Sequence, residues 1–565
     1  LTITFICILV GVIGALASHL FLLLIGLSSD LFLDLLAGYH QLDTVAEGGM
    51  AQSFGGMGTW LIPLSTMLGG LLSGYLVYSF APEAEGHGTD ATIRSFHRLG
   101  GSVRARVPFV KALASAVTIG SGGAAGREGP VAQIAAGIAS LIGSWFKLTV
   151  PNRRIILLAG MAAGISASFK SPLGAALFTV EVLYGTFEFE SGVLGYCIIA
   201  SSVAYAVNGF FSGWTPIFQI PSGIVFDRSM DLFWYALLGL LCGIMSSVLP
   251  LIFYRTQSFF QKLSLPPPLK PALGGLLVGL IALFAPQVLG GGYGWMEKAL
   301  NAELPLGLLL MLGVLKIFAL SFTIGSGGSG GVFAPVLYIG TMFGAAFALI
   351  VGSWFPYVAG GPNPHGMAVV GMAALFAGAA RVPIAALIMT AELTGGYGLI
   401  VPTMFAVTIS FMVESGITRR WRAEPTLYKA QVPSRADSPT HQQEYVEMGL
   451  NLLQGGEVAM PGNITLPNLT TFLQFGKPLP LGKSGDFLYT VEVPERSAVI
   501  GKTVKEVRFI DKILISAIIR ENVTITPRGA STLEGGDQLI VICKPEDLPS
   551  LIAELEESPG EDSAD

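Results

Sequence analysis

The chain has 565 residues, of which 52% are hydrophobic and only 12% are charged, with a formal net charge of -6. Its mean hydropathy is +0.64, and soluble domains carry about 25% charged residues, roughly twice as many. This composition predicts a membrane protein, and the acidic balance excludes a basic nucleic-acid-binding protein. Four scattered cysteines exclude a disulfide-rich secreted protein.

The charged residues divide the chain into two regions. Thirty-six of the 70 lie in the 149 residues from 417 to 565, and 34 lie in the 416 residues before them. No charge occurs between Lys316 and Arg381, a stretch of 64 residues. We therefore expect a membrane domain followed by a soluble domain.

Apolar segments follow one another through the first region. The segment Leu1–Ser28 carries no charge and exceeds the ~20 residues that span a bilayer, so we expect a true span and not a cleaved signal peptide. We also expect the natural N-terminus to be missing, because the chain begins without Met. The other apolar segments cover residues 56–80, 131–146, 155–169, 172–187, 191–212, 232–254, 271–287, 305–323, 331–354, 367–380, 383–394 and 397–416. Several are too short to cross alone, which is typical of transporters.

Loop charges orient these segments. The loop after the first span is acidic and carries Asp30, Asp34, Asp43 and Glu47. The loop after the second span is basic and carries Arg94, Arg98, Arg104, Arg106 and Lys111. The positive-inside rule places the basic loop in the cytoplasm and the acidic loop outside. Three arginines within residues 419–422 mark a cytoplasmic exit, so we expect a multi-pass cell-membrane protein with a cytoplasmic C-terminal region.

Two segments of the membrane region recur in order. Residues 118–130 read TIGSGGAAGREGP and residues 323–335 read TIGSGGSGGVFAP, with eight of thirteen positions identical. Residues 160–181 and 371–392 match at eight of twenty-two positions, including Pro172/Pro383 and Glu181/Glu392. Duplication explains these matches better than chance similarity of Gly-rich and Ala-rich segments. In transporters such halves often meet at a substrate site at the membrane midplane.

The glycine runs predict an anion site. Glycines closed by a proline at a helix start leave backbone N–H groups unpaired, and these amides with the helix dipole attract an anion without a fixed positive charge. The alternative is that the glycines only allow helices to pack closely.

Glu128 favours the anion reading. A carboxylate in an apolar membrane segment is costly and by default suggests function. It lies beside the amides that would hold an anion, so it can compete with that anion until protonation releases it. The alternative is a salt bridge to the adjacent Arg127.

These residues carry a family resemblance. GREGP (126–130), GVFAP (331–335) and GHGTD (86–90) resemble the three anion-site signatures of the CLC chloride channel and transporter family. The likeness covers residues 1–429. It implies an all-α polytopic membrane domain of two inverted repeats, assembled as a homodimer in the lipid bilayer with one anion pathway per subunit.

The resemblance also implies roles for individual residues. Glu128 would be the protonatable gate. Chloride, or another small monovalent anion, would be bound by His87, Gly88, Arg127, Gly129, Val332, Phe333 and Tyr428. Tyr428 resembles the tyrosine whose hydroxyl closes the central site from the inside.

Two departures from the family pattern bear on mechanism. His87 and Asp90 stand in the GHGTD signature where the family has GSGIP, and His87 can contribute its amide, an imidazole donor or a titrating charge. Val182 stands where exchangers of the family commonly carry an inner proton-transferring glutamate. Valine cannot transfer a proton, which favours passive, gated conduction. The alternative is H⁺/Cl⁻ exchange along another proton route, with Glu128, His87 and Asp90 as candidates.

The C-terminal region predicts a small α/β domain. Residues 430–482 read as a linker, and residues 557–565 as an acidic tail. In between, residues 483–556 alternate strand-like runs (LYTVEV, ILISAII, VTITP, DQLIVIC) with helical TVKEVRF and a final helix. This segment resembles the RCK-C/TrkA-C regulatory subdomain of potassium-channel regulators, which implies a small-molecule regulator. The alternative is a dimer-stabilising cap without a ligand.

The sequence disfavours two other functions. A potassium channel needs a TVGYG-like filter, and the sequence has none. A membrane enzyme needs a nucleophile–base pair or clustered metal ligands, and the six histidines do not cluster by spacing. We therefore expect no enzyme activity, no metal and no cofactor.

Overall fold

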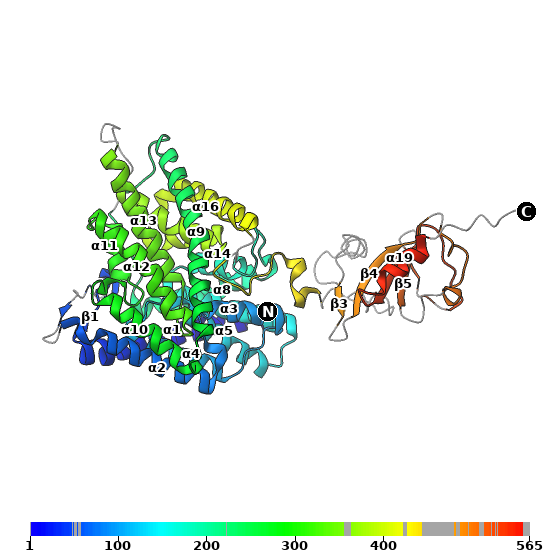
Figure 1. Ribbon diagram of the computed structural model, residues 1–565, viewed down its shortest axis with the longest axis horizontal. Helices are drawn as coiled ribbons and strands as arrows, with labels where there is room; N and C mark the ends of the chain where they lie inside the picture. Colours follow the sequence, from blue (N-terminus) through cyan, green and yellow to red (C-terminus); the bar gives the residue numbers. More distant parts are fainter. Residues whose placement is uncertain are drawn as a thin grey trace, which may run out of the picture. The chain divides into compact units, whose positions relative to one another are not determined.

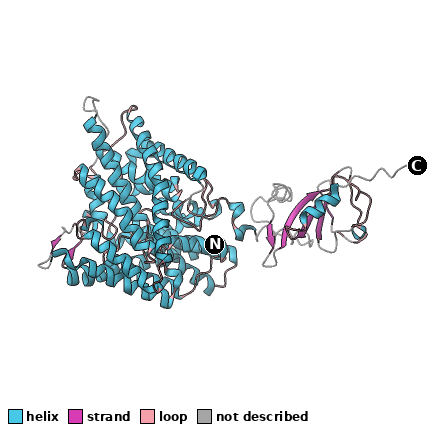
Figure 2. Cartoon of the chain, in the orientation of Figure 1, coloured by secondary structure: helices cyan, strands magenta, loops and turns pink. Residues whose placement is uncertain are grey.

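The computed structural model describes residues 2–47, 49, 53–54, 58–221, 223–354, 363–421, 426–442, 479–481, 486–494, 497–507, 513–520, 523–525, 527 and 529–556. The chain forms two compact units, residues 1–435 and residues 436–565. The first unit is almost entirely helical, and the five-stranded sheet lies in the second (Figure 2). The expected linker 430–482 lies mostly outside the described residues, and the acidic tail 557–565 lies entirely outside them.

The first unit is built from two successive sets of helices (Figure 1). The first set is α1 (Thr2–Ser29), α2 (Ile62–Phe80), α3 (Thr89–Arg98), α4 (Arg106–Gly120), α5 (Glu128–Trp145), α6 (Val150–Phe169), α7 (Pro172–Glu181) and α8 (Ser191–Ser212). The second set is α9 (Asp231–Lys262), α10 (Lys270–Ala282), α11 (Tyr293–Leu300), α12 (Leu306–Gly325), α13 (Phe333–Trp354), α14 (Pro364–Ala380), α15 (Pro383–Thr394) and α16 (Ile400–Trp421). The predicted repeat matches this arrangement, since α5 corresponds to α13 and α7 to α15.

Within the described residues, six helical segments are long and apolar enough to cross a membrane: 2–37, 191–212, 231–262, 306–325, 333–354 and 397–420. Others, such as α7 and α15, are much shorter. Each of these two short helices follows a basic residue with left-handed backbone, Lys170 (φ 53°) and Arg381 (φ 55°), and begins with a proline. The same unusual backbone at matching positions supports a true duplication.

Helices pack closely where glycine removes the side chain. Gly340 on α13 and Gly371 on α14 face each other, and a Cβ on Gly371 would lie 2.6 Å from the carbonyl oxygen of Gly340. In the first repeat, a Cβ on Gly160 of α6 would lie 2.7 Å from the carbonyl oxygen of Ala135 on α5. Close packing therefore accounts for these glycines.

The prediction of a basic loop over residues 94–111 was wrong. Over these residues the structure has the second half of α3 and the first turns of α4. Lys111 is fully buried. Its ammonium donates hydrogen bonds to the carbonyl oxygens of Ala84 (3.1 Å) and Gly86 (2.6 Å). Lys316, its counterpart on α12, donates to Val288 and Gly290 at 2.7 Å each. The apolar residues after Arg106 form the buried helix α4. The charges on its first turns led to the prediction of a loop.

The acidic loop that carries Asp43 and Glu47 connects α1 to α2. Helix α1 continues as a wider helical turn, η1 (Asp30–Ala37), and β1 (Tyr39–His40) pairs antiparallel with β2 (Ser53–Phe54). Between the strands, the short turn η2 (Val45–Glu47) is held by a hydrogen bond from the Val45 N–H to Glu297 Oε2 on α11 (2.8 Å). We call residues 38–54 the outer loop.

The second unit is a small antiparallel sheet with a C-terminal helix. Its strands are β3 (Leu479–Leu481), β4 (Asp486–Glu492), β5 (Leu514–Arg520), β6 (Val523–Ile525) and β7 (Gln538–Cys543), in the order β3-β4-β7-β5-β6. Helix α19 (Leu548–Glu556) contributes Leu551 and Leu555 to the buried core. The predicted strands and final helix are confirmed. Of TVKEVRF (503–509), the structure describes residues 503–507, which contain a one-turn helix over Val504–Glu506.

Candidate functional site

The two glycine signatures meet in the first unit. The N–H of Gly126 donates to the carbonyl of Gly331 (2.8 Å), and the N–H of Gly331 donates to the carbonyl of Gly126 (2.7 Å). Immediately after this pair of hydrogen bonds, α5 begins at Glu128 and α13 at Phe333. Two helix N-termini from different repeats therefore begin at one place, where their free amides favour negative charge.

The Glu128 side chain occupies this place. It is 1% exposed, and its carboxylate lies beside the backbone N–H groups of Glu128 itself and Ala334. A Cβ added to Gly126 would clash with Oε2 of Glu128. Glycine at position 126 therefore leaves room for the carboxylate, which close helix packing alone would not require.

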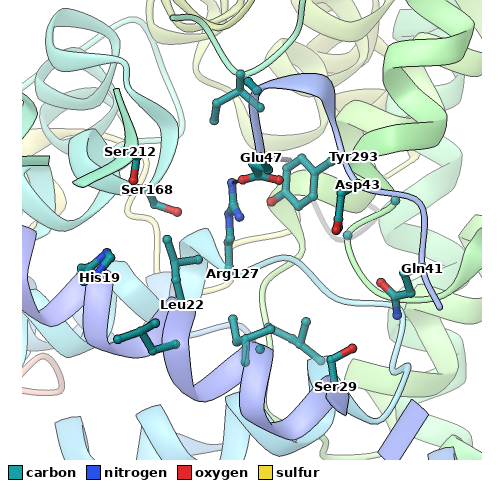
Figure 3. A pocket seen from close by; sticks show the side chains of 18 of the residues that line it. His19, Leu22, Ser29, Gln41, Asp43, Glu47, Arg127, Ser168, Ser212 and Tyr293 are labelled. Atoms are coloured by element: carbon teal, nitrogen blue, oxygen red, sulfur yellow. Dashed lines mark hydrogen bonds and ion pairs between the residues drawn. The ribbon is translucent and has the colours of Figure 1, made fainter. Parts of the chain in front are cut away.

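Arg127 and Tyr293 flank the carboxylate. The Tyr293 hydroxyl donates a hydrogen bond to Glu128 Oε1. The guanidinium of Arg127 lies 4.6 Å from the centre of the Tyr293 ring and forms a 2.5 Å ion pair with Glu47 on the outer loop (Figure 3). Its Nε is 3.9 Å from Glu128 Oε1. The salt bridge considered for Arg127 and Glu128 is thus a long contact, and the closer partner of Arg127 is Glu47.

A cavity of about 640 Å³ lies beside Arg127 and Tyr293. Its charged lining comes mainly from Asp34, Asp43, Glu47, Arg127 and Lys170, and Asp43, Glu47, Arg127 and Tyr293 lie together in Figure 3. Burial and the neighbouring Glu47 carboxylate raise the pKa of Asp43 to about 6. We call it the outer cavity.

A second cavity, of about 840 Å³, is lined by His87, Gly88 and Asp90. The rings of His87 and Tyr428 lie 5.3 Å apart, and Tyr428 is 1% exposed. The Nδ1 atom of His87 is buried and has no hydrogen-bond partner among the described residues. Asp90 Oδ1 accepts a 2.7 Å hydrogen bond from the N–H of Ala430, so one carboxylate oxygen stabilises the backbone after Tyr428.

Buried aromatic side chains connect Phe333, at the start of α13, with Tyr428. The ring of Phe333 is 4.1 Å from that of Phe376 and 5.6 Å from that of Phe178. Phe178 is in turn 6.4 Å from Tyr428. Val332 and Phe333 are 2% and 3% exposed. Phe178 thus links Phe333 to Tyr428. The Glu128 carboxylate lies beside the Ala334 amide at the same end of α13, although Tyr428 lies 300 residues beyond Glu128 in the chain.

Val182 follows directly after the last residue of α7. It is fully buried, and its carbonyl accepts a hydrogen bond from Gln431 (3.0 Å). The neighbouring Glu181 carboxylate accepts hydrogen bonds from the backbone N–H groups of Ile384 (3.0 Å) and Ala385 (2.7 Å) at the start of α15. Glu181 therefore caps a helix.

Sequence reasoning missed Tyr293 and Glu47. A signal for Tyr293 existed, because GGGY at 290–293 matches GHGT at 86–89 at an offset of 204, which aligns Tyr293 with Thr89. No signal in the sequence pointed to Glu47, since the outer loop has no counterpart in the second repeat.

Comparison with known proteins gives two family matches. The model of the voltage-gated chloride channel family matches residues 69–415, and that of the TrkA-C domain matches residues 488–556. The H(+)/Cl(-) exchange transporter ClcA of Yersinia pestis is 33% identical over 349 residues, which cover 60% of this chain and 72% of that protein. The voltage-gated ClC-type chloride channel ClcB of Escherichia coli is 31% identical over 380 residues, covering 66% and 88%.

Solved structures share the fold. A slow cyanobacterial Cl⁻/H⁺ antiporter aligns with a TM-score of 0.64 and 24% identity, covering 74% of this chain and 94% of that one. A CLC-type fluoride/proton antiporter aligns with a TM-score of 0.61 and 18% identity, covering 77% and 98%.

Proposed function

Because the chain belongs to the voltage-gated chloride channel family, we propose that it transports chloride across a membrane through one pathway per subunit, with Glu128 as the protonatable gate. The observation that carries this proposal is the Glu128 carboxylate lying in the cradle that the Gly126 and Gly331 loops form together. A carboxylate and a chloride ion compete for the same amides. Protonation removes the charge of the carboxylate and favours the anion.

The remaining site residues receive roles along the same pathway. Amides of Gly129 and Phe333 and the guanidinium of Arg127 attract the anion near the gate. The unpaired Nδ1 of His87, the amide of Gly88 and the hydroxyl of Tyr428 would bind it near the second cavity. Backbone and neutral donors hold an anion loosely enough to release it, which transport requires.

Passive conduction is the mode that Val182 favours. The family position for an inner proton-transferring acid holds a buried valine, and Glu181 beside it is engaged in capping α15. A proton entering from the inside thus lacks the usual relay.

Proton-coupled exchange is the second candidate. ClcA of Yersinia pestis is named as an H(+)/Cl(-) exchange transporter. His87 and Asp90 line the second cavity and offer titrating groups for another route to Glu128.

One experiment separates these modes. Purified protein in chloride-loaded liposomes is followed for chloride efflux and for proton movement at once. Chloride efflux without proton movement supports conduction, and uphill proton movement at a fixed ratio to chloride overturns it. Absence of chloride flux overturns the whole assignment. Glu128→Gln should give flux that no longer depends on pH.

We also propose that the chain is a homodimer and that its C-terminal unit is a cytoplasmic regulatory domain. The TrkA-C match supports regulation by a small molecule. Size-exclusion chromatography with light scattering in detergent tests the dimer, and comparison of flux with and without residues 436–565 tests regulation.

A further inference from the structure

Tyr293 touches the gate from the opposite repeat. It is the first residue of α11, and its hydroxyl donates to Glu128 Oε1 from 165 residues away in the chain. Two contacts hold its ring: a stacked arrangement with Phe218, with centroids 6.3 Å apart, and the Arg127 guanidinium at 4.6 Å. The hydroxyl is thus directed at the carboxylate by packing of the ring.

Arg127 is itself fixed from the outer loop. Glu47 binds its guanidinium at 2.5 Å, and the turn that carries Glu47 is tied through Val45 to Glu297. Glu297 lies on α11, one turn beyond Tyr293, and also accepts the N–H of Gln219 at 2.9 Å. One short helix therefore positions both the donor to the gate and the loop that holds Arg127.

The two repeats place hydroxyls at equivalent points. Thr89, which matches Tyr293, begins α3, and its hydroxyl lies within hydrogen-bonding reach of the Tyr428 hydroxyl. The hydroxyl at the start of α11 thus contacts Glu128, and the hydroxyl at the start of α3 lies near Tyr428. A serine or threonine at position 293 would be too short to fill the space that the tyrosine ring occupies between Phe218 and Arg127.

We propose that Tyr293 is a positioning residue that retains the gate: its hydroxyl holds the Glu128 carboxylate in the anion pathway. This rests on the gate role proposed above for Glu128. Hydrogen bonds to ionised acceptors are the stronger class, so the bond adds to the closed arrangement while the carboxylate is charged. Opening requires that this bond be broken, and an entering chloride ion can then accept the same O–H.

The test is chloride efflux from proteoliposomes at pH 7.5 and pH 4.5, with Tyr293→Phe alone and combined with Glu128→Gln. Phenylalanine keeps the ring and removes only the donor. We expect about tenfold faster efflux at pH 7.5, since hydrogen bonds to charged groups are worth this order, and a smaller ratio between the two pH values. In the Glu128→Gln background, Tyr293→Phe should change neither quantity.

Tyr338→Phe is the matched control. Tyr338 is a buried tyrosine with a lysine ammonium 4.8 Å from its ring centre and a hydroxyl that donates to the Gln287 carbonyl, not to the gate. Its flux should stay within about twofold of the wild-type value, because the hydrogen bond that it loses goes to Gln287 and not to Glu128. Chloride binding measured by calorimetry at pH 7.5 gives a second readout, because a less firmly held carboxylate should let chloride bind more tightly in Tyr293→Phe.

The outcomes are distinguishable. Wild-type flux and chloride affinity in Tyr293→Phe, with a pH-independent Glu128→Gln, overturn the proposal and leave the gate role intact. An equal rise in both backgrounds also overturns it, since the hydroxyl then acts without Glu128. A Glu128→Gln variant with unchanged pH dependence shows that the proposed gate itself is wrong.

Discussion

Glu181 and Glu392 cap each other's helices. Glu181, the last residue of α7, accepts the N–H groups of Ile384 and Ala385 at the start of α15. Glu392, near the end of α15, accepts the N–H of Gly174 (2.9 Å) at the start of α7. The two short helices therefore run antiparallel as equivalent partners, which is direct structural support for two inverted repeats.

Removing either charge should weaken the membrane unit. Glu181→Gln and Glu392→Gln each keep the side-chain length but replace an acceptor pair at a helix N-terminus. We expect each to lower the free energy of unfolding by about 1–3 kcal/mol, the cost of leaving buried donors poorly paired. Thermal unfolding in detergent, followed by circular dichroism, measures this. Glu303→Gln serves as control, because Glu303 is half exposed and forms a weak ion pair with Lys298, with 3.8 Å between the charged atoms. An equal loss of stability in this control would contradict the capping role.

Glu47→Gln should slow chloride flux. Without the Glu47 charge, the carboxylate next nearest to the Arg127 guanidinium is that of Glu128, 3.9 Å away. If Glu128 is the gate, as proposed above, the guanidinium then strengthens its closed position. We expect efflux at pH 7.5 to fall two- to fivefold, about the worth of a partly exposed ion pair.

Glu303→Gln is the control for this change, since Glu303 lies 3.8 Å from Lys298 and lines neither of the two cavities. Its efflux should equal that of the wild type. Faster efflux in Glu47→Gln would mean that the pair with Arg127 keeps the pathway closed, the opposite of the expected role.

Docking of the outer loop should depend on pH through Asp43. Its pKa in the folded protein is about 6, whereas an undocked Asp titrates near 3.9. The docked loop thus binds the proton more tightly, so the loop loses stability as pH rises from about 4 to about 6. The charged or titrating groups around Asp43 are Glu47, His40, Arg127 and Asp34.

Hydrogen exchange of residues 39–47, corrected for intrinsic rates, measures this effect. Protection should be greater at pH 5 than at pH 7.5 in the wild type. Asp43→Asn, which cannot ionise, should show nearly equal protection at the two values. An unchanged difference in Asp43→Asn would assign the pH dependence to another group.

Arg520 should be essential to the C-terminal sheet. It makes two 2.8 Å hydrogen bonds to Asp537, which is fully buried. Arg520→Leu would leave that carboxylate with the Glu534 N–H as its remaining described partner. We expect a loss of about 2–4 kcal/mol in this unit, because a buried charge loses its counterion. Hydrogen exchange in β5 and β7 should accelerate, while that of α5 and α13 should not change.

Much of the fold followed from local sequence signals. The apolar segments, the repeat and the family resemblance are confirmed by the helices and by the family match over residues 69–415. The predicted apolar segments that start at residues 172 and 383 begin where α7 and α15 begin, and each helix starts with a proline, which is favoured at that position. Helix α4 was not predicted, because Arg106 and Lys111 lie among its apolar residues and Arg104 lies just before it.

Contacts within the site were harder to predict. The Glu128 carboxylate was identified from its cost in an apolar segment, which is a property of one position. Its contact with Tyr293 depends on how the second repeat folds back onto the first, and the pairing of Arg127 with Glu47 depends on the path of the outer loop. Neither distance is encoded by spacing along the chain.

The hydrogen bonds between Gly126 and Gly331 have a consequence for synthesis of the protein. The first repeat emerges from the ribosome with Glu128 and only half of the amides that surround it. Until Gly331 and α13 are inserted, those halves cannot meet. We therefore expect a chain truncated before residue 331 to lack the anion site that the two loops form together.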